Sequence, residues 1–213
     1  MGTSTGYPLY LKKGDDDIRI HNPVHRVQEW LDGCGEIHDP VFTASLKDEL
    51  LTNEKVANGK RRLIFCSPLE TTVAAGAVFG ELCEKLKEAR FDWPGKVGLV
   101  VNNEWDLLVL PHRAHKVTCC MDYSRWDSTV PSSLVAAACK IMADVVGTSP
   151  ARQLARKLSQ PRQVIVGAHV VTISKGLPSG IPATSILNCI IHWLAALMAT
   201  MVGNKLDVVS AYS

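Results

Sequence analysis

The stretch CMDYSRWDST, residues 120–129, decides the fold, because two aspartates stand five residues apart directly after a short apolar run. Residues 117–121 are β-prone, so we expect a strand that ends at Asp122 and presents this carboxylate at a sheet edge. Asp122 and Asp127 offer hard oxygen ligands of the kind that suit Mg²⁺ bridging to phosphates, provided that rigid elements hold them. On spacing alone the commoner explanation is structural: Asp122 ends a strand and Asp127 caps the next segment.

A second group of candidate residues follows the glycine- and proline-rich loop GLPSGIP, residues 176–182. Pro182 is expected to open a long apolar helix that reaches about residue 202, and the free N–H groups at its start can meet an anion. Thr184, Asn188 and His192 recur every four residues, so they form one polar stripe on this helix. Buried polar groups need partners, either in the protein or in a ligand. The ordinary explanation is three satisfied core residues, and we prefer it for His192.

Basic residues form a third group, Lys47, Lys55 and the run Lys60-Arg61-Arg62, just before the β-prone segment 63–66. Such a cluster can hold a triphosphate or a template backbone through charge-assisted hydrogen bonds. A run of charge is more often a solvated face, so this group has little weight by itself.

The composition indicates a globular chain without a distinctive charge. Of its 213 residues 46% are hydrophobic, which is enough for a sizeable core, and 23 basic residues against 21 acidic ones leave a net charge of +2. No overall field therefore indicates a nucleic-acid partner, and any basic surface has to be local. The 7 cysteines are an odd number without a Cys-x-x-Cys pair, which favours reduced thiols in a cytosolic compartment.

Neither a secretory signal nor a membrane span is expected. The first residues, MGTSTGYPLYLKKGDDD, lack a basic region that leads into an apolar stretch, so they look internal to a longer protein. The most apolar run, residues 186–202, is shorter than the roughly 20 residues of a spanning helix and contains Asn188 and His192.

The remaining local patterns predict alternating helices and strands around these groups. Residues 1–40 are expected to be loops and turns with a short helix near 27–31. We expect a strand or loop at 60–66, an amphipathic helix at 69–90, a β-prone run at 97–101, a helix at 131–146 with Pro131 in its first turn, a basic helix at 152–158, and a hairpin at 163–174 with its turn at Gly167-Ala168.

Taken in order, the three groups resemble the fingers motif and the first two palm motifs of positive-strand RNA virus RNA-dependent RNA polymerases. The matching segments are LKDELLTNEKVANGKRRLIF at 46–65, CMDYSRWDST at 120–129 and GLPSGIPATSILNCIIHW at 176–193. The strings DYSRWDST and GLPSG are most similar to those of caliciviruses, including noroviruses and sapoviruses, with picornaviruses a more distant match. TSTGYP at 3–8 also fits the start of the fingers, so the resemblance covers essentially the whole chain.

The resemblance implies a role for each matching residue. Asp122 would be the catalytic, metal-binding aspartate that holds Mg²⁺, or Mn²⁺, at the triphosphate and the primer 3′ end. Asp127 and Asn188 would sense the ribose 2′-hydroxyl, which is the group that separates RNA from DNA building blocks. The other nucleotide-binding positions implied are Ser179 and Gly180 in the flexible loop, Thr184 in the selection network, and Lys47, Lys55 and Arg62 on the nucleotide entry path, with Lys60 and Arg61 as RNA-binding residues.

The implied architecture is an α+β right-hand polymerase fold with fingers and the N-terminal part of the palm, and with the thumb absent. Fingers would take residues 1–79 and a return at 159–174, and the palm 80–158 and 175–213. The implied activity is template-directed RNA synthesis in viral genome replication and transcription, in which ribonucleoside monophosphates are added to a primer 3′ end. Partners would be RNA template and primer, ribonucleoside triphosphates and other viral replication proteins, in membrane-associated complexes of the host cytoplasm.

The sequence departs from the family pattern in two places. Leu51 stands where many relatives have arginine, which puts one phosphate contact in doubt. Relatives also carry a Gly-Asp-Asp hairpin soon after the second palm motif, and none follows Trp193 here. A two-metal reaction needs carboxylates from both places, so we expect residues 1–213 alone to bind nucleotide or RNA weakly and to catalyse nothing.

Two alternatives stay open. A cysteine protease is suggested by Gly33-Cys34-Gly35 and several histidines, although the helical middle of the chain does not suit a β-barrel protease scaffold. A non-enzymatic RNA-binding module would use the basic segment on a degenerate palm. Reverse transcriptases fit less well, because they typically carry an aromatic side chain at the site of the 2′-hydroxyl.

Overall fold

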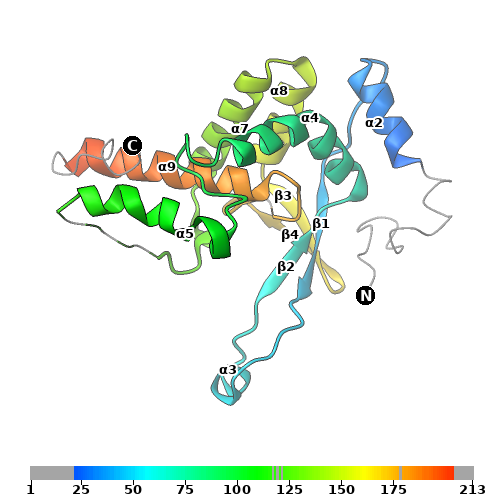
Figure 1. The fold of residues 1–213 in the computed structure, drawn as a ribbon. Helices are drawn as coiled ribbons and strands as arrows, with labels where there is room; N and C mark the ends of the chain where they lie inside the picture. The colour runs from blue at the N-terminus through cyan, green and yellow to red at the C-terminus, as the bar shows by residue number, and fades with distance from the viewer. Residues whose placement is uncertain (1–21, 117, 119, 121, 178, 204–213) are drawn as a thin grey trace.

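The computed structural model describes residues 22–203 apart from positions 117, 119, 121 and 178. A four-stranded sheet lies beside a group of helices (Figure 1). Two of its strands continue into a long ribbon that extends away from the helices. The helices are α2 (Pro23–Leu31), α3 (Asn53–Ala57), α4 (Leu69–Glu88), α5 (Val101–Val109), the 3-10 helix η1 (Leu110–Ala114), α6 (Trp126–Thr129), α7 (Ser132–Val146), α8 (Ser149–Ser159) and α9 (Thr184–Gly203). The strands are β1 (Val41–Leu46), β2 (Leu63–Cys66), β3 (Arg162–Val166) and β4 (His169–Ile173).

The sheet joins two parts of the chain that are far apart in sequence, in the order β2-β1-β3-β4. β1 pairs with β2 in antiparallel register, Thr43 opposite Cys66, and with β3 in parallel register, Val41 opposite Gln163. A parallel pair needs a crossover connection, and here helices α4 to α8 lie between the two strands in the chain. The sheet therefore brings β3 and β4, at residues 162–173, back beside β1 and β2.

The hairpin of β3 and β4 confirms the prediction from sequence, since Val166 pairs with His169 across a turn at Gly167 and Ala168. Phe42 and Val164 are register partners on one face of the sheet, and both are almost fully buried. Val170 and Val171 in the edge strand β4 are exposed, so the hydrophobic side of the sheet is concentrated where β1 meets β3.

Helices α7 and α8 form a hairpin that packs against α4 and α9. Gly147 ends α7 in the left-handed conformation at φ 77°, and the Thr148 hydroxyl then accepts the N–H of Ala151 at 3.3 Å to begin α8. The buried side of α8 consists of Ala151, Leu154, Ala155 and Leu158, at the spacing of one helix face. Together with buried residues of α4, α7 and α9 they form one continuous core. The expected helices at 69–90, 131–146 and 152–158, and the long helix after Pro182, are thus confirmed.

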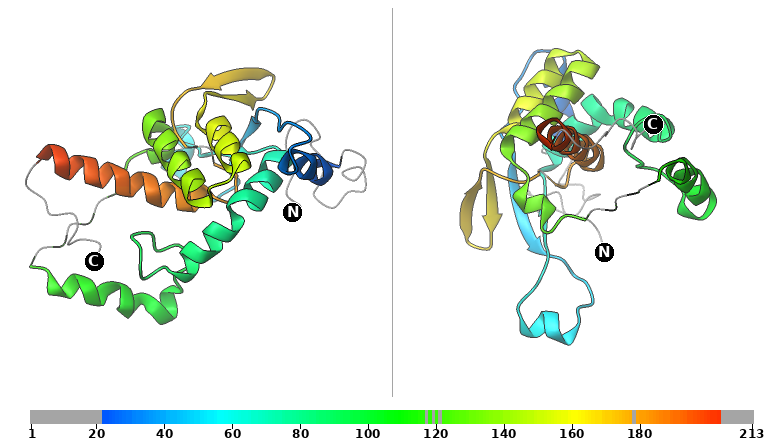
Figure 2. Two further views of the ribbon diagram at one scale, coloured as in Figure 1. Left: turned by 90° about the horizontal axis from the view of Figure 1, so that it is seen from above. Right: turned by 90° about the vertical axis from the view of Figure 1, so that its left-hand side faces the viewer.

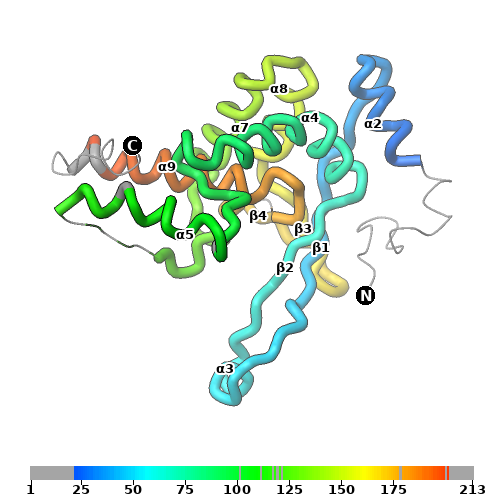
Figure 3. Tube along the Cα trace, viewed as in Figure 1, coloured from blue at the N-terminus to red at the C-terminus, as the bar shows by residue number. Residues whose placement is uncertain are grey.

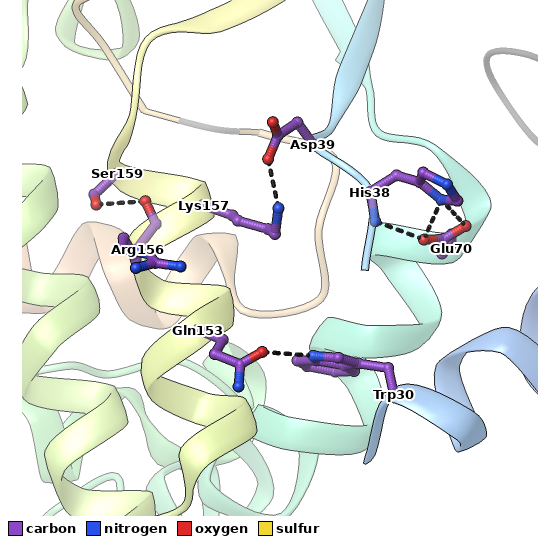
Figure 4. A network of polar contacts seen from close by, with 8 residues as sticks. All are labelled: Trp30, His38, Asp39, Glu70, Gln153, Arg156, Lys157 and Ser159. Atoms are coloured by element: carbon purple, nitrogen blue, oxygen red, sulfur yellow. Dashed lines mark hydrogen bonds and ion pairs between the residues drawn. The ribbon is translucent and has the colours of Figure 1, made fainter. Parts of the chain in front are cut away.

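A set of polar contacts fastens α2 and the following loop to α4 and α8 (Figure 4). The indole N–H of Trp30 donates to Gln153 Oε1 at 2.9 Å, and Lys157 pairs with Asp39. Glu70, which is buried, accepts the backbone N–H of His38 at 3.0 Å and pairs with Arg26 at 3.0 Å. Because several donors surround this carboxylate, its removal from water is compensated.

Helix α5 and η1 lie apart from the sheet, on the same side of the molecule as the C-terminal part of α9 (Figure 2). The expected strand at 97–101 is wrong: a turn lies at 97–98, and α5 begins at Val101. Glu104 explains the helix start, because its carboxylate accepts the N–H of Val100 at 2.7 Å and pairs with Arg90. Both donors lower the pKa of the Glu104 carboxyl, with Arg90 as the main cause.

In the described part of the chain no helix combines the length and the hydropathy needed to cross a membrane. The expected loops at residues 1–21 lie outside the described residues.

Candidate nucleotide-binding site

The loop at 176–180 lies directly against α6, so the second and first palm-like segments are in contact. The N–H of Leu177 donates to the carbonyl of Asp127 at 3.0 Å, and the N–H of Gly176 donates to the carbonyl of Val130 at 2.9 Å. Gly176 has φ +79°, and a Cβ there would come within 2.2 Å of the Asp127 carbonyl oxygen. Only glycine permits both the conformation and the close approach.

The other end of the same loop lies against the end of β2. The Ser67 hydroxyl donates to the Gly180 carbonyl at 2.9 Å, and Ser67 is buried. Gly180 has φ +83°, and a Cβ at this position would meet the Phe65 carbonyl oxygen at 2.6 Å. The structure therefore brings together the end of β2, the helix that carries Asp127, and the loop before α9. Figure 3 follows the chain from the sheet through this region into α9.

Both aspartates of the central segment are exposed. Arg125 adopts the left-handed conformation at φ 53° and turns the chain into the short helix α6, whose hydroxyl groups at Ser128 and Thr129 donate to the Arg125 carbonyl. The strand expected at 117–121 lies partly outside the described residues, at positions 117, 119 and 121, and Asp122 itself is in irregular backbone.

Asn188 is held by the residue that precedes Asp127. Its side-chain oxygen Oδ1 accepts the indole N–H of Trp126 at 2.7 Å, and both side chains are half-buried. Asn188, one turn into α9, thus lies beside α6, and its described contact is with Trp126. Thr184 lies one turn earlier, where its hydroxyl donates to the Ile181 carbonyl at 2.8 Å.

His192, the third member of the polar stripe, differs from our expectation of a satisfied core residue. Its ring packs edge-on against Tyr123 at 5.2 Å between centroids and against Trp126 at 6.2 Å. Its Nε2 atom is buried and has no hydrogen-bond partner among the described residues. The periodicity of the helix located this side chain correctly, but its surroundings are aromatic rather than polar.

The basic residues separate into two sets. Lys47 and Arg62 lie opposite each other just beyond the paired strands, where the chain leaves β1 and enters β2, and both face Glu49, at 3.1 and 3.7 Å. Lys55 lies in α3, at the far end of the ribbon (Figure 1). Lys60 lies beside it, because its N–H donates to the Lys55 carbonyl at 2.9 Å. Lys60 and Arg61 are exposed there. The structure thus places Lys47 and Arg62 nearer the loop at 176–180 along the ribbon than Lys55, Lys60 and Arg61.

The carboxylates of the central segment are the candidate ligands for the expected metal ion. The carboxylate of Asp122 is exposed and has the hard oxygen atoms that Mg²⁺ prefers. The described residues contain no group of three or more His, Cys, Asp or Glu that could hold a metal ion. The exposed carboxylate of Asp122 therefore fits the chemistry of one metal ligand.

The glycine-dependent loop, the segment with the two aspartates and the segment that runs into β2 are the three parts of the chain whose sequences resemble polymerase motifs. Residues 1–212 match the family of viral RNA-dependent RNA polymerases, so the chain belongs to this family. It is 33% identical to the genome polyprotein of Norwalk norovirus over 99% of the chain, and 32% identical to that of Southampton virus over the same share. A bovine enteric calicivirus, Newbury agent-1, has a polyprotein 35% identical over 76% of the chain.

The solved structures support the same architecture. The RNA-dependent RNA polymerase 3Dpol of a sicinivirus superposes with a TM-score of 0.76 over 97% of this chain, at 25% identity. The expected α+β polymerase fold is therefore confirmed. The chain spans 46% of that polymerase and 12% of the norovirus polyproteins.

Family membership also favours the polymerase interpretation over the cysteine protease. Cys34 is exposed in the loop after α2, where its Sγ lies 3.8 Å from the Asp32 carbonyl.

The sequence did not identify Trp126 and Ser67 as site residues. The position of Trp126 directly before Asp127 could have indicated a role in the site. Nothing in the sequence around Ser67 indicates that its hydroxyl holds the loop at Gly180.

Proposed function

We propose that this chain forms the fingers and the first part of the palm of a viral polymerase that copies an RNA template. The enzyme adds ribonucleoside monophosphates to a primer 3′ end during genome replication and transcription. The meeting of β2, α6 and the loop before α9 at Gly176 and Gly180 carries this proposal, because it assembles the three segments that have to act on one nucleotide. Fingers at 1–79 and 159–174 and palm at 80–158 and 175–213 remain the proposed division, and its first boundary falls within α4.

Each residue then has a task. Asp122 is one ligand of a Mg²⁺ or Mn²⁺ ion, which when bound neutralises charge on the triphosphate and the attacking oxygen. Asp127, Thr184 and Asn188 select the ribose. The remaining residues bind phosphate or RNA: Lys47, Lys55 and Arg62 along the nucleotide path, and Lys60 and Arg61 on the RNA.

The loop of Ser179 and Gly180 is suited to respond to a nucleotide. It is fixed at both ends, through Gly176 to α6 and through Gly180 to Ser67, while Ser179 between them is half-buried. If a bound nucleotide displaced this loop, the displacement would therefore reach α6 and the end of β2 together.

The test is nucleotide incorporation by the polymerase that contains this chain, purified with and without Asp122→Asn. We expect this variant to lose incorporation by several orders of magnitude while it stays folded, because the substitution removes a metal-binding charge. Asp144→Asn is the matched control, since Asp144 is an exposed aspartate on α7 that pairs with Lys140. Unchanged incorporation by Asp122→Asn would refute the proposal.

The alternative is an RNA-binding module without activity. In that case the parent protein would show no incorporation, and its affinity for RNA would be the same with and without Mg²⁺ and after Asp122→Asn.

For the 213-residue chain by itself we propose weak binding of nucleotide or RNA and no catalysis. The proposed location is a membrane-associated replication complex in the host cytoplasm, with other viral replication proteins as partners.

A further inference from the structure

We propose that Trp126 is a positioning residue that fixes the rotation of the Asn188 side-chain amide and so sets the selection of ribose over deoxyribose. The inference deepens the proposed function and rests on it, since it needs Asn188 to face the sugar. Its basis is the 2.7 Å hydrogen bond between Trp126 Nε1 and Asn188 Oδ1, which joins residues 62 positions apart.

The chemistry of the two groups permits one orientation of the amide. An indole N–H only donates, whereas an asparagine side chain accepts through its oxygen and donates through its nitrogen. The atom of Asn188 that faces Trp126 therefore has to be Oδ1. The two hydrogens on Nδ2 are consequently directed away from the indole, where they can donate to another acceptor such as a sugar hydroxyl.

The indole is itself held from several sides. Tyr123 packs against it with 4.5 Å between ring centroids, and the ring of His192, one turn beyond Asn188 on α9, lies at 6.2 Å. Because Nε2 of His192 has no hydrogen-bond partner among the residues the structure describes, we assign this ring a packing role. The backbone bond from Leu177 to the Asp127 carbonyl holds α6 in place at the same time. Rotation of the indole would require these neighbours to move.

One short helix thereby controls both sides of sugar recognition. Trp126 and Asp127 are consecutive residues of α6, so the element that carries the Asp127 carboxylate also fixes the amide of Asn188. Without the indole N–H the amide can turn by half a rotation and present Oδ1 where Nδ2 had been. In the proposed site the Asp127 carboxylate accepts the single hydrogen of the 2′-hydroxyl, so that hydroxyl has none left to donate to Oδ1. A ribonucleotide then loses its hydrogen bond to Asn188, whereas a deoxyribonucleotide has no such bond to lose.

The hydrogen bond is tested first, by NMR of the polymerase labelled with ¹⁵N-tryptophan. The Trp126 indole signal is assigned by its loss in Trp126→Phe. We expect Asn188→Ala to shift this signal and to speed its exchange with water, whereas Asn188→Asp, which keeps an acceptor oxygen, retains a protected signal. An indole signal that is the same in Asn188→Ala as in the parent would overturn the proposal.

The functional test compares kcat/KM for a ribonucleotide and its 2′-deoxy analogue. For Trp126→Phe we expect the ratio to fall by about threefold to tenfold, the range for one lost hydrogen bond, with most of the change on the ribonucleotide. Asn188→Asp should lower the ratio as well although it keeps the indole bond, because it removes the Nδ2 donor. Trp105→Phe, at an exposed tryptophan on α5, is the control and should leave the ratio unchanged.

The outcomes separate this inference from the proposed function. An equal loss on both nucleotides in Trp126→Phe, with a normal loss of discrimination in Asn188→Asp, would make Trp126 merely structural and overturn the inference alone. An unchanged ratio in Asn188→Asp would instead remove Asn188 from sugar recognition, and the inference with it. Incorporation that survives Asp122→Asn would refute the proposed function itself.

Discussion

Gly176 lies directly against the backbone carbonyl of Asp127, and its own N–H donates to the carbonyl of Val130 at 2.9 Å. This contact links the loop before α9 to the helix that carries Trp126 and Asp127. It also explains why position 176 requires glycine, because a side chain there would collide with the backbone of α6.

Gly176→Ala is expected to lower the free energy of unfolding by about 1 to 3 kcal/mol, because a Cβ would overlap the Asp127 carbonyl and φ is positive. Chemical denaturation with circular dichroism measures the change. Gly80→Ala is the matched control: Gly80 lies inside α4 with open space where a Cβ would stand, so alanine should raise the free energy of unfolding by up to about 1 kcal/mol. Equal effects at both glycines would contradict the packing at Gly176.

Ser67→Ala tests how the other end of the loop is held. The Ser67 hydroxyl is within 2.9 Å of the Gly180 carbonyl and 2.7 Å of the Thr72 hydroxyl, and its loss leaves buried polar groups with fewer partners. We expect the free energy of unfolding to fall by about 1 to 2 kcal/mol. In the polymerase the KM for nucleotide should rise more than kcat falls. Ser133→Ala, at an exposed serine on α7, should change neither quantity.

The parts of the fold that the sequence predicted have long or regular patterns. Helix α4 spans 20 residues with buried positions at helical spacing, and the β3–β4 hairpin has runs of β-branched residues on both sides of a glycine turn. Strand β1 was missed because Phe42 is its only fully buried residue, so no alternation is visible. Helix α3 has five mostly polar residues, and its start depends on the Thr52 cap.

The candidate site shows the same division between local and distant signals. The order of the motifs implied that the three segments act together, and the structure shows that β2, α6 and the loop before α9 are in contact. The bond from Trp126 to Asn188 could not be read from sequence, since a single donor and acceptor 62 residues apart leave no periodic trace. The orphaned Nε2 of His192 likewise depends on which rings pack around it.

Glu70→Gln should weaken the attachment of α2 to the helices. The buried carboxylate pairs with Arg26 and accepts the backbone N–H of His38, so an amide removes the charge that compensates these donors. We expect a loss of about 1 to 3 kcal/mol in the free energy of unfolding. Glu81→Gln, which removes an exposed ion pair with Lys85 on α4, should have a smaller effect, because solvent screens that pair. Proteolysis after α2 gives an independent measure of its attachment.

Glu104 is expected to make stability depend on pH. Donation from Arg90 and from the Val100 N–H lowers the pKa of its carboxyl in the folded protein. A lowered pKa means that the stabilisation is complete above the pKa of the unfolded chain and is lost as the pH falls through the folded value. Glu104→Gln should therefore be less stable than the parent at neutral pH, and the difference should shrink in acid. A difference that stays constant from neutral to strongly acidic pH would contradict this role.

The cysteines should react with a thiol reagent according to burial, and this also tests the protease alternative. Burial raises the pKa of Cys139 in α7 to about 12, so its reactive thiolate is scarce at mildly alkaline pH and its sulfur is shielded. Cys83 in α4 is buried as well and its pKa is raised for the same reason, whereas Cys34 and Cys120 are exposed. We expect Cys34 and Cys120 to be modified first and at similar rates, and Cys83 and Cys139 only on unfolding, with mass spectrometry of digested protein as the readout. A Cys34 that reacts far faster than Cys120 would instead favour the protease alternative, because a catalytic cysteine has to be more reactive than an ordinary exposed one. The described contact of its Sγ is with the Asp32 carbonyl, at 3.8 Å.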